Sequence, residues 1–387
     1  MFNFKKLFII IVSFILFQNC NRKDESKNQY SKTHTIKYIG DKIISLDSLI
    51  DPWQANYFFY DSDSVNKLFL LSTIDNSLQI YDWKTGKMES KKVLPKQGPN
   101  GVGNAGSLMV KNLDSIFVLS GFQFKLYQLD RNFNLVKSYS LLDPIQKKES
   151  LGQGMFATSN HACAMGYWKN NIYIGGYPFI DRKEEKFYLY GNTSLKLDLT
   201  SGELKYLTKS PPSYSKRFNT GYIIAPQQTV PSLTFNYDKR QMIISYMTDF
   251  NIEVFDMEKK ESQYYFIGSD EVDELKWANK NLTGRDLSKY FIKQPGFSGI
   301  YYDSYRNIYY RIFEKPNPNK VDGYDKQPWT IPSVIIIDDK FKKIGEIEIH
   351  KVYSLTTIII AKEGLYLRKY VEDEDKMVFS LFKPIKL

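Results

Sequence analysis

The chain has 387 residues, of which 16% are aromatic, with 29 Tyr and 26 Phe and no long helical periodicity. This composition favours β-sheets, and all-β architectures often reach this length as a single domain. The formal net charge is +10. Because both signs of charge are interspersed and no basic run occurs, the excess indicates a solvated surface and gives no sign of nucleic-acid binding.

The N-terminal segment has the plan of a secretory signal peptide. Two lysines precede an apolar run over residues 7–17, which is too short to span a bilayer comfortably. Cys20 follows the end of this run, so we predict a signal peptide over residues 1–19 and lipidation of Cys20. The alternative is an ordinary signal peptide that is cleaved nearby. Residues 20–33, rich in Asn, Ser, Lys and Gln, predict a flexible tether.

Beyond the tether, one pattern of strands and turns recurs six times. In the copy at residues 107–137, an apolar strand, a polar turn and a second strand are followed by a third strand that ends in Asp130 and by a fourth strand. Such internal repetition is typical of propellers. The second strands of the six units are predicted at residues 68–70, 116–118, 172–174, 242–244, 308–310 and 365–367.

Five of the predicted third strands end in an aspartate at the same position of the unit. An Asp side chain accepts hydrogen bonds from backbone N–H groups that follow it, and therefore opens a turn. The five residues are Asp82, Asp130, Asp198, Asp256 and Asp338.

The sixth unit has no fourth strand before the chain ends. Residues 34–46 have strand composition and no partner of their own. We therefore predict that they complete the last sheet and close a ring without exposed edges. The predicted fold of residues 34–387 is all-β, a six-bladed β-propeller of four-stranded antiparallel blades closed by an N-terminal strand.

Long connections fall between units or between second and third strands, which places them on one face of a propeller. Loops on a rigid scaffold are where binding groups concentrate. In the connection at residues 269–293 we predict a helix that begins at Ser269 or Asp270 and is broken by Gly284 and Pro295. This helix either covers the channel or packs on the rim.

Three sets of residues are candidates for ligand binding. The glycine-rich loop at residues 96–106 is either a tight turn between blades or a ligand cradle, and His161 is predicted near the channel. Aromatic and basic residues of the face loops suit binding surfaces, with packing among the loops themselves as the alternative. The candidates are Gln97, Asn100, Asn104, His161, Tyr214, Arg217, Trp277, Arg285 and Trp329.

No catalytic or metal-binding motif stands out. The sequence has no HxH, HExxH or CxxC spacing and no Gly-x-Ser-x-Gly motif. We therefore predict no metal, no cofactor and no assigned catalytic residue. Cys163 is predicted to be a buried structural thiol.

The signal segment, Cys20, the six units and the Gly98-Pro99-Asn100-Gly101 loop resemble the TolB-like six-bladed propeller lipoproteins of Bacteroidota, which include families of unknown function. Residues 17–20 are similar to a relaxed lipoprotein cleavage site. Residues 23–25 resemble the signal that exports such lipoproteins to the cell surface. The resemblance implies an outer-membrane lipoprotein, anchored by its N-terminal lipid on the surface or on the periplasmic side.

This resemblance implies a binding or scaffolding module more than an enzyme. We expect a peptide, glycan or protein to bind the loop-bearing face. The alternative is a hydrolase, lactonase or lyase centred on the channel of the same fold. A structural subunit of an outer-membrane assembly is a third reading.

Overall fold

The computed structural model describes residues 30–47, 50, 56–62, 64–142, 154–160, 162–178, 183–224, 228–318, 330–349, 353–373 and 375–387. The predicted signal peptide, Cys20 and most of the predicted tether lie outside these residues. His161 and Trp329 also lie outside them.

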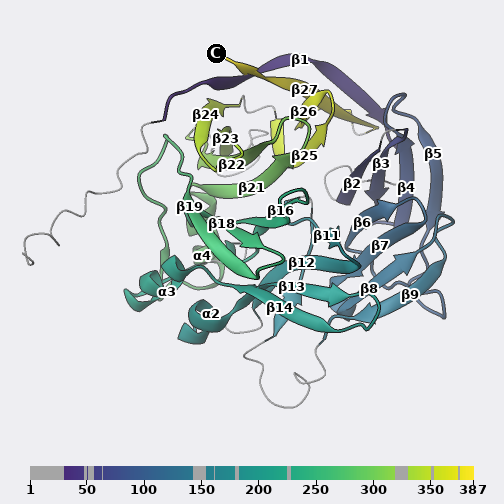
Figure 1. Ribbon diagram of the computed structural model, residues 1–387, viewed down its shortest axis with the longest axis horizontal. Coiled ribbons are helices and arrows are strands. Elements are labelled where there is room, and N and C mark those ends of the chain that lie inside the picture. The colour runs from purple at the N-terminus through teal and green to yellow at the C-terminus, as the bar shows by residue number, and fades with distance from the viewer. Residues whose placement is uncertain are drawn as a thin grey trace, which may run out of the picture. The chain divides into compact units, whose positions relative to one another are not determined.

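Six antiparallel sheets form a ring, one sheet for each predicted unit (Figure 1). The six-bladed propeller predicted from the sequence is therefore confirmed. The strands of each blade follow, from the innermost outward. Blade 1 has β2 (Asn56–Asp61), β3 (Asn66–Leu71), β4 (Ser77–Asp82) and β5 (Met88–Val93); blade 2 has β6 (Ser107–Asn112), β7 (Ser115–Ser120), β8 (Lys125–Leu129) and β9 (Leu135–Ser140); blade 3 has β10 (Met155–Ala157) with β11 (Gly166–Trp168), β12 (Asn171–Pro178), β13 (Asn192–Asp198) and β14 (Leu204–Lys209). Blade 4 has β16 (Ser232–Asn236), β17 (Gln241–Ser245), β18 (Asn251–Asp256) and β19 (Glu261–Phe266); blade 5 has β21 (Gly296–Asp303), β22 (Ile308–Pro316), β23 (Thr330–Ile337) and β24 (Lys343–Glu348); blade 6 has β25 (Tyr353–Ala361), β26 (Gly364–Lys369), β27 (Lys376–Lys386) and β1 (His34–Ser45).

The N-terminal strand closes the ring as predicted. β1 pairs antiparallel with β27, from His34 opposite Lys386 to Ser45 opposite Lys376, with one irregularity between Tyr38 and Gly40. The two strands run side by side along one edge of the ring in Figure 1. The first and last parts of the propeller are thus joined in one sheet, which gives β27 a partner on its outer side.

The aspartates that end the third strands open turns in all five blades where they were predicted. In each turn an Asp Oδ1 accepts a hydrogen bond from a backbone N–H two or three residues on. The donors are Thr85 at 2.8 Å, Asn132 at 2.8 Å, Thr200 at 2.8 Å, Glu258 at 2.9 Å and Lys340 at 3.0 Å.

Blade 3 departs from the pattern at its innermost strand. The repeat pattern predicts one strand before the second strand at residues 172–174, but the structure has two short strands, β10 and β11, paired with opposite ends of β12. The chain leaves the sheet between them because Asn160 Oδ1 accepts from the backbone N–H groups of Ala162 and Cys163, at 2.8 and 2.7 Å. These bonds form a turn instead of a ladder.

Cys163 lies in this interruption and is buried, as predicted. A Cβ atom on Gly175 would lie 2.5 Å from its sulfur, so the thiol packs against the bare backbone of β12. Burial raises the pKa of Cys163 to about 12. The thiol is therefore protonated at neutral pH and serves packing.

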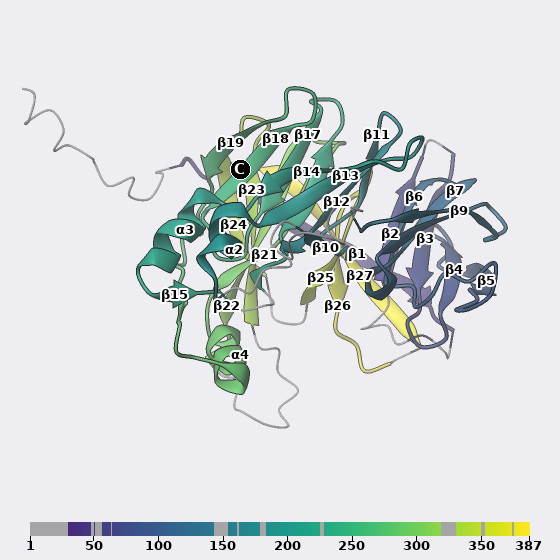
Figure 2. The same ribbon diagram turned by 90° about the horizontal axis from the view of Figure 1, so that it is seen from below.

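Short helices and one small ladder occur in the long connections. They are α2 (Glu185–Tyr190), α3 (Pro212–Asn219), α4 (Gly284–Ile292), the 3-10 turn η1 (Gly121–Gln123), and the paired strands β15 (Tyr222–Ile223) and β20 (Ala278–Asn279). Figure 2 shows α2, α3, β15 and α4 grouped at one side of the molecule, around blades 3 and 4. We name α2, α3, β15, β20 and α4 the accessory layer.

The predicted start of a helix at Ser269 or Asp270 was wrong. Both residues bind blade 5 instead of capping a helix: Ser269 Oγ donates to Glu346 Oε1 at 2.6 Å, and the Asp270 N–H donates to Glu346 Oε2 at 2.8 Å. The helix of this connection, α4, begins at Gly284, the residue that was predicted to break it. The helices α2 and α3 were not predicted.

The core lies between the faces of neighbouring blades. Phe117, Leu119 and Leu126 of blade 2, for example, pack in one cluster with Ile172 and Ile174 of blade 3. Alternating residues of each strand point to opposite faces, so every blade contributes to two such clusters. No helix among the described residues is long and apolar enough to cross a membrane.

Candidate ligand site in the central channel

The innermost strands of all six blades surround a cavity of about 420 Å³ at the centre of the ring. This volume lies within the range of roughly 300–1,000 Å³ that is usual for small-molecule sites. Eight of the described lining residues are aromatic: Tyr57, Phe58, Phe59, Tyr167, Phe235, Tyr237, Tyr301 and Tyr302. The others are Asn56, Ser107, Leu108, Met109, Val110, Lys111, Asn160, Ala164, Met165, Thr234, Ile358, Ile359 and Ile360.

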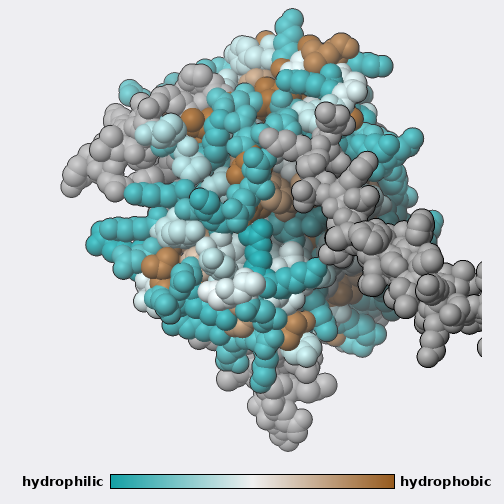
Figure 3. Space-filling view, turned by 90° about the vertical axis from the view of Figure 1, so that its left-hand side faces the viewer, coloured by the Kyte–Doolittle hydropathy of each residue, from teal (hydrophilic) through white to brown (hydrophobic). Residues whose placement is uncertain are grey.

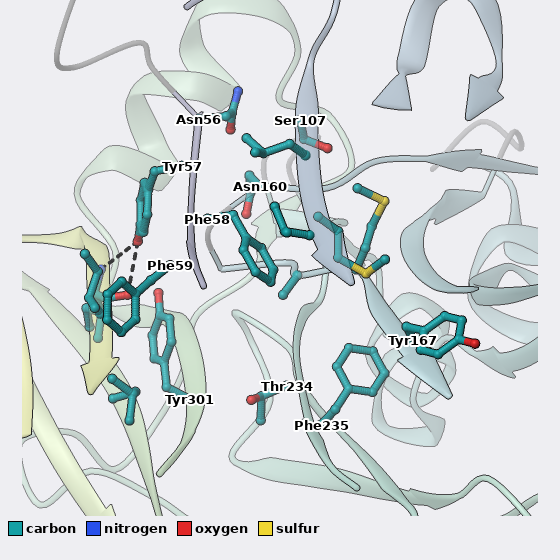
Figure 4. A pocket seen from close by; sticks show the side chains of 18 of the residues that line it. Asn56, Tyr57, Phe58, Phe59, Ser107, Asn160, Tyr167, Thr234, Phe235 and Tyr301 are labelled. Carbon is teal, nitrogen blue, oxygen red and sulfur yellow. Dashed lines mark hydrogen bonds between the residues drawn. The ribbon is translucent and has the colours of Figure 1, made fainter. Parts of the chain in front are cut away.

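The sequence of β2 explains much of this aromatic wall. Successive residues of a strand point to opposite faces, and the Tyr-Phe-Phe run at residues 57–59 places aromatic rings on both faces of β2. The Tyr57 hydroxyl bonds to the backbone of Ile358 in blade 6, accepting from its N–H at 2.8 Å and donating to its carbonyl at 3.2 Å. Figure 4 shows these two bonds. Tyr57 therefore joins blade 1 to blade 6 across the last interface of the ring.

Two other hydroxyls of the lining are buried and have no hydrogen-bond partner among the described residues. Tyr301 is 8% exposed and Ser107 is 2% exposed. Leaving a buried hydroxyl unpaired costs roughly 1–3 kcal/mol. In Figure 4 the hydroxyl of Tyr301 points toward Phe59 and Tyr57. Such groups are expected where a ligand or an ordered water completes the site.

Burial raises the pKa of Tyr301 above its usual value, and the nearby Glu314 carboxylate raises it further. Burial likewise raises the pKa of Tyr57, and raises the pKa of Tyr237 to about 12. These phenols are therefore neutral at physiological pH and keep their hydrogens.

Backbone contacts hold two polar side chains of the lining in place. Thr234 Oγ1 accepts from the backbone N–H of Tyr302 at 3.0 Å, which links blade 4 to blade 5. Asn160 Oδ1 is occupied by the turn N–H groups described above. The split of the innermost strand in blade 3 thus brings Asn160 to the channel.

Among the described residues of the lining, Lys111 is the one with a charged side chain. Its Nζ lies 4.2 Å from the centroid of the Tyr167 ring, a distance at which a cation is attracted by the aromatic face. Nearby, the rings of Phe235 and Tyr237 stack with centroids 5.8 Å apart. One end of β6 therefore contributes a cation to a lining whose other described residues are uncharged.

The described lining holds no Asp, Glu, His or Cys. Elsewhere in the described part of the chain, no group of three or more such residues is arranged to hold a metal ion. The chemistry available from the described lining is hydrogen bonding, aromatic contact and one positive charge.

The glycine-rich loop belongs to the interface between blades 1 and 2. Asn76 Nδ2 donates to the carbonyls of Leu94 and Gly103, at 2.9 and 3.1 Å, and Asn76 Oδ1 accepts from the N–H of Ala105 at 2.9 Å. These contacts fit the alternative of a tight turn between blades. The candidate residues Gln97, Asn100 and Asn104 are exposed and do not line the channel.

Three other candidates come together in the accessory layer. The rings of Tyr214 and Trp277 lie 4.8 Å apart and are buried. Arg217 donates to the carbonyl of Leu275 and lies 5.5 Å from the Trp277 ring. These residues pack the rim over blades 3 and 4. Arg285 is exposed on α4.

The left-hand side of the ring, turned toward the viewer in Figure 3, is mostly hydrophilic, with apolar residues in small separate groups. This view shows no broad apolar surface of the kind that marks a docking site. Ligand binding by the candidate residues of the loop-bearing face stays a prediction.

The channel residues Ser107, Lys111, Thr234 and Tyr301 were missed by sequence reasoning. A signal was present, because each lies in a predicted first strand or beside its turn, and first strands form the channel wall. Which of their side chains keep an unpaired polar atom depends on neighbours from other blades, and the repeat pattern does not encode these.

The chain is similar to a known protein family and to solved structures. A family model for a domain of unknown function, DUF4221, matches residues 33–348. The crystal structure of a DUF4221 member from Bacteroides vulgatus is similar over 92% of this chain and 100% of that chain, with a TM-score of 0.78 and 20% identity. No curated protein matches the sequence.

Two other solved structures show weaker similarity. A putative exported protein from Bacteroides fragilis covers 92% of this chain and 97% of its own, with a TM-score of 0.52 and 10% identity. A virginiamycin B lyase from Staphylococcus aureus covers 90% of this chain and 99% of its own, with a TM-score of 0.44 and 13% identity. Likeness at these identities concerns the fold alone. The chain belongs to the DUF4221 family, whose model spans most of the propeller.

Proposed function

We propose that this protein is a binding module that holds a small organic molecule in its central channel. The observation that supports this most is an aromatic cavity of about 420 Å³ whose lining includes Ser107 and Tyr301, two residues with buried hydroxyls that have no hydrogen-bond partner among the described residues. Aromatic walls bury the apolar surface of a ligand, and a few polar groups fix its orientation.

As the binding site, the channel has more support than the loop-bearing face. On that face, Tyr214 and Trp277 are buried against each other and are not displayed to a partner. A peptide, glycan or protein that binds the face is the second candidate, and exposed Arg285 is its best probe.

An enzyme centred on the channel has less support. Hydrolases and lyases need a proton acceptor or a nucleophile beside the substrate. The described lining supplies hydroxyls, the amides of Asn56 and Asn160, and Lys111, with no carboxylate, imidazole or thiol among them. We therefore favour binding over catalysis.

We also propose that the protein is a lipid-anchored protein of the outer membrane, on its surface or on its periplasmic side. The signal-like residues 1–19 and the position of Cys20 support this address. The similar fold of an exported protein from Bacteroides fragilis agrees with it.

A melting screen tests the binding proposal. A ligand of the native state raises the melting midpoint by mass action, so the purified protein is screened against a library of small aromatic, amphiphilic and sugar molecules. Ala164→Trp fills the channel and should abolish every shift that arises there. Val136→Trp adds the same indole on the outermost strand of blade 2, where Val136 is 59% exposed, and should leave the shifts unchanged.

A further inference from the structure

We propose that the ligand of the central channel is an organic anion: a flat, apolar body that bears a carboxylate. This inference rests on the proposed function and adds the chemical class of the ligand. It follows from which hydrogen-bonding atoms of the lining are already used and which are left.

The acceptor atoms of two lining side chains are occupied by backbone N–H groups. Asn160 Oδ1 takes two such bonds, so its amide N–H group is the end left for a ligand. Thr234 Oγ1 accepts from Tyr302, so its own hydrogen remains to be donated. Both side chains are thereby set up as donors.

The hydroxyls of Tyr301 and Ser107 add further donors. Because burial raises the pKa of Tyr301, its phenol keeps its hydrogen at neutral pH. The Ser107 hydroxyl is buried and has no partner among the described residues. Tyr57 provides the contrast, because its hydroxyl is already bonded to both backbone groups of Ile358.

The charge of the lining also favours an anionic ligand. Lys111 is the charged group of the described lining, and it forms no ion pair with a carboxylate of the described part of the chain. The carboxylate that acts on Tyr301 is Glu314, which lies outside the lining and accepts from Thr330 Oγ1 at 2.6 Å. Hydrogen bonds from donors to a carboxylate are roughly twice as strong as neutral ones. An anion is therefore the ligand whose charge and hydrogen-bond acceptors this lining matches best.

Other ligand classes fit less well. A neutral sugar carries many hydroxyl hydrogens that each need an acceptor. The polar side chains of the described lining offer few: the Oδ1 of Asn56, whose amide group donates to the Gly106 carbonyl, and the hydroxyl oxygens. A cation would gain from the aromatic faces, but it would meet Lys111 and no lining carboxylate. A carboxylate on a flat ring system uses both the donors and the aromatic walls.

The test compares three probes of one shape on the purified protein by calorimetric titration: 2-naphthoate, 2-naphthamide and 2-naphthyltrimethylammonium. We expect 2-naphthoate to bind at least tenfold more tightly than the amide, and the ammonium compound to bind most weakly. Lys111→Met should lower the affinity for the carboxylate about tenfold and leave the amide unchanged. Lys87→Met, at an exposed turn outside the channel, is the matched control and should change neither.

Equal affinity for carboxylate and amide, or preference for the ammonium compound, would overturn the inference. If the probes bind equally and Ala164→Trp abolishes their binding, the channel remains a binding site and only its preference for anions is wrong. Failure of 2-naphthoate to bind also rejects the proposed class of ligand. The proposed function is then judged separately by the library screen with Ala164→Trp.

Discussion

The guanidinium of Arg311 lies 3.4 Å from the ring centroid of Phe297 and is fully buried. It donates to neutral groups: Ser245 Oγ at 2.9 Å and the carbonyls of Phe250, Ile267 and Asp249 at 2.6 Å each. Arg311 lies on β22 of blade 5, and these acceptors lie on blade 4 and on the connection that follows it. One side chain therefore fixes the interface between blades 4 and 5.

Replacing this guanidinium should strongly destabilise the protein. Arg311→Met leaves several buried carbonyls without donors, at roughly 1–3 kcal/mol each, so we expect a loss of at least about 3 kcal/mol in the free energy of unfolding. Arg311→Lys should recover little, because an ammonium cannot reproduce the planar fork of donors. Urea denaturation measures both, and Arg285→Met, at an exposed site, is the control. A loss below about 1 kcal/mol for Arg311→Met would contradict this role.

Glu253 should make stability depend on pH. Its side chain is 2% exposed and accepts from Tyr246 at 2.9 Å and Ser262 at 2.5 Å, and burial raises its pKa. An acid whose pKa is raised by folding stabilises the folded state below its unfolded pKa of about 4.3. That stabilisation is lost as the pH rises through the folded pKa, at up to about 1.4 kcal/mol per unit.

Glu253→Gln removes this titration. We expect the variant to gain stability relative to the wild type as the pH rises from about 4.5 to 7.5. Denaturation at several pH values gives the difference. Glu261→Gln, exposed on the neighbouring strand β19, should show no such trend. A flat difference for Glu253→Gln would mean that Glu253 does not control this dependence.

The closing strand should be essential for cooperative folding. Deletion of residues 34–46 leaves β27 as an exposed edge and breaks the pairing of Figure 1. We expect the sharp melting transition to be lost, whereas deletion of residues 21–29 from the predicted tether should leave it intact. Differential scanning calorimetry measures both, and unchanged melting after the first deletion would refute ring closure by β1.

Lipidation should depend on Cys20. Cells that express the protein are labelled with radioactive palmitate, and we expect Cys20→Ser to abolish the label and to release the protein from the membrane fraction. Cys163→Ser is the matched control because these are the two cysteines of the chain. Labelling that persists in Cys20→Ser would point to an ordinary signal peptide.

Local patterns predicted most of the fold. The aspartate turns depend on residues within one hairpin, and the missing last strand was evident from the order of the units. The helix start at Ser269 was wrong because its partner, Glu346, lies far along the chain on blade 5. The split strand of blade 3 depends on one side-chain turn at Asn160. The channel site combines atoms from six blades. Which of these atoms remain available to hydrogen-bond a ligand is therefore seen only in the folded ring.

The measurement that tests the central claim most directly is calorimetric titration of the best ligand from the melting screen. We predict binding of one molecule per chain, abolished by Ala164→Trp and unchanged by Val136→Trp and Arg285→Ala. Binding that survives in Ala164→Trp but is lost in Arg285→Ala would contradict the account and place the ligand on the loop-bearing face.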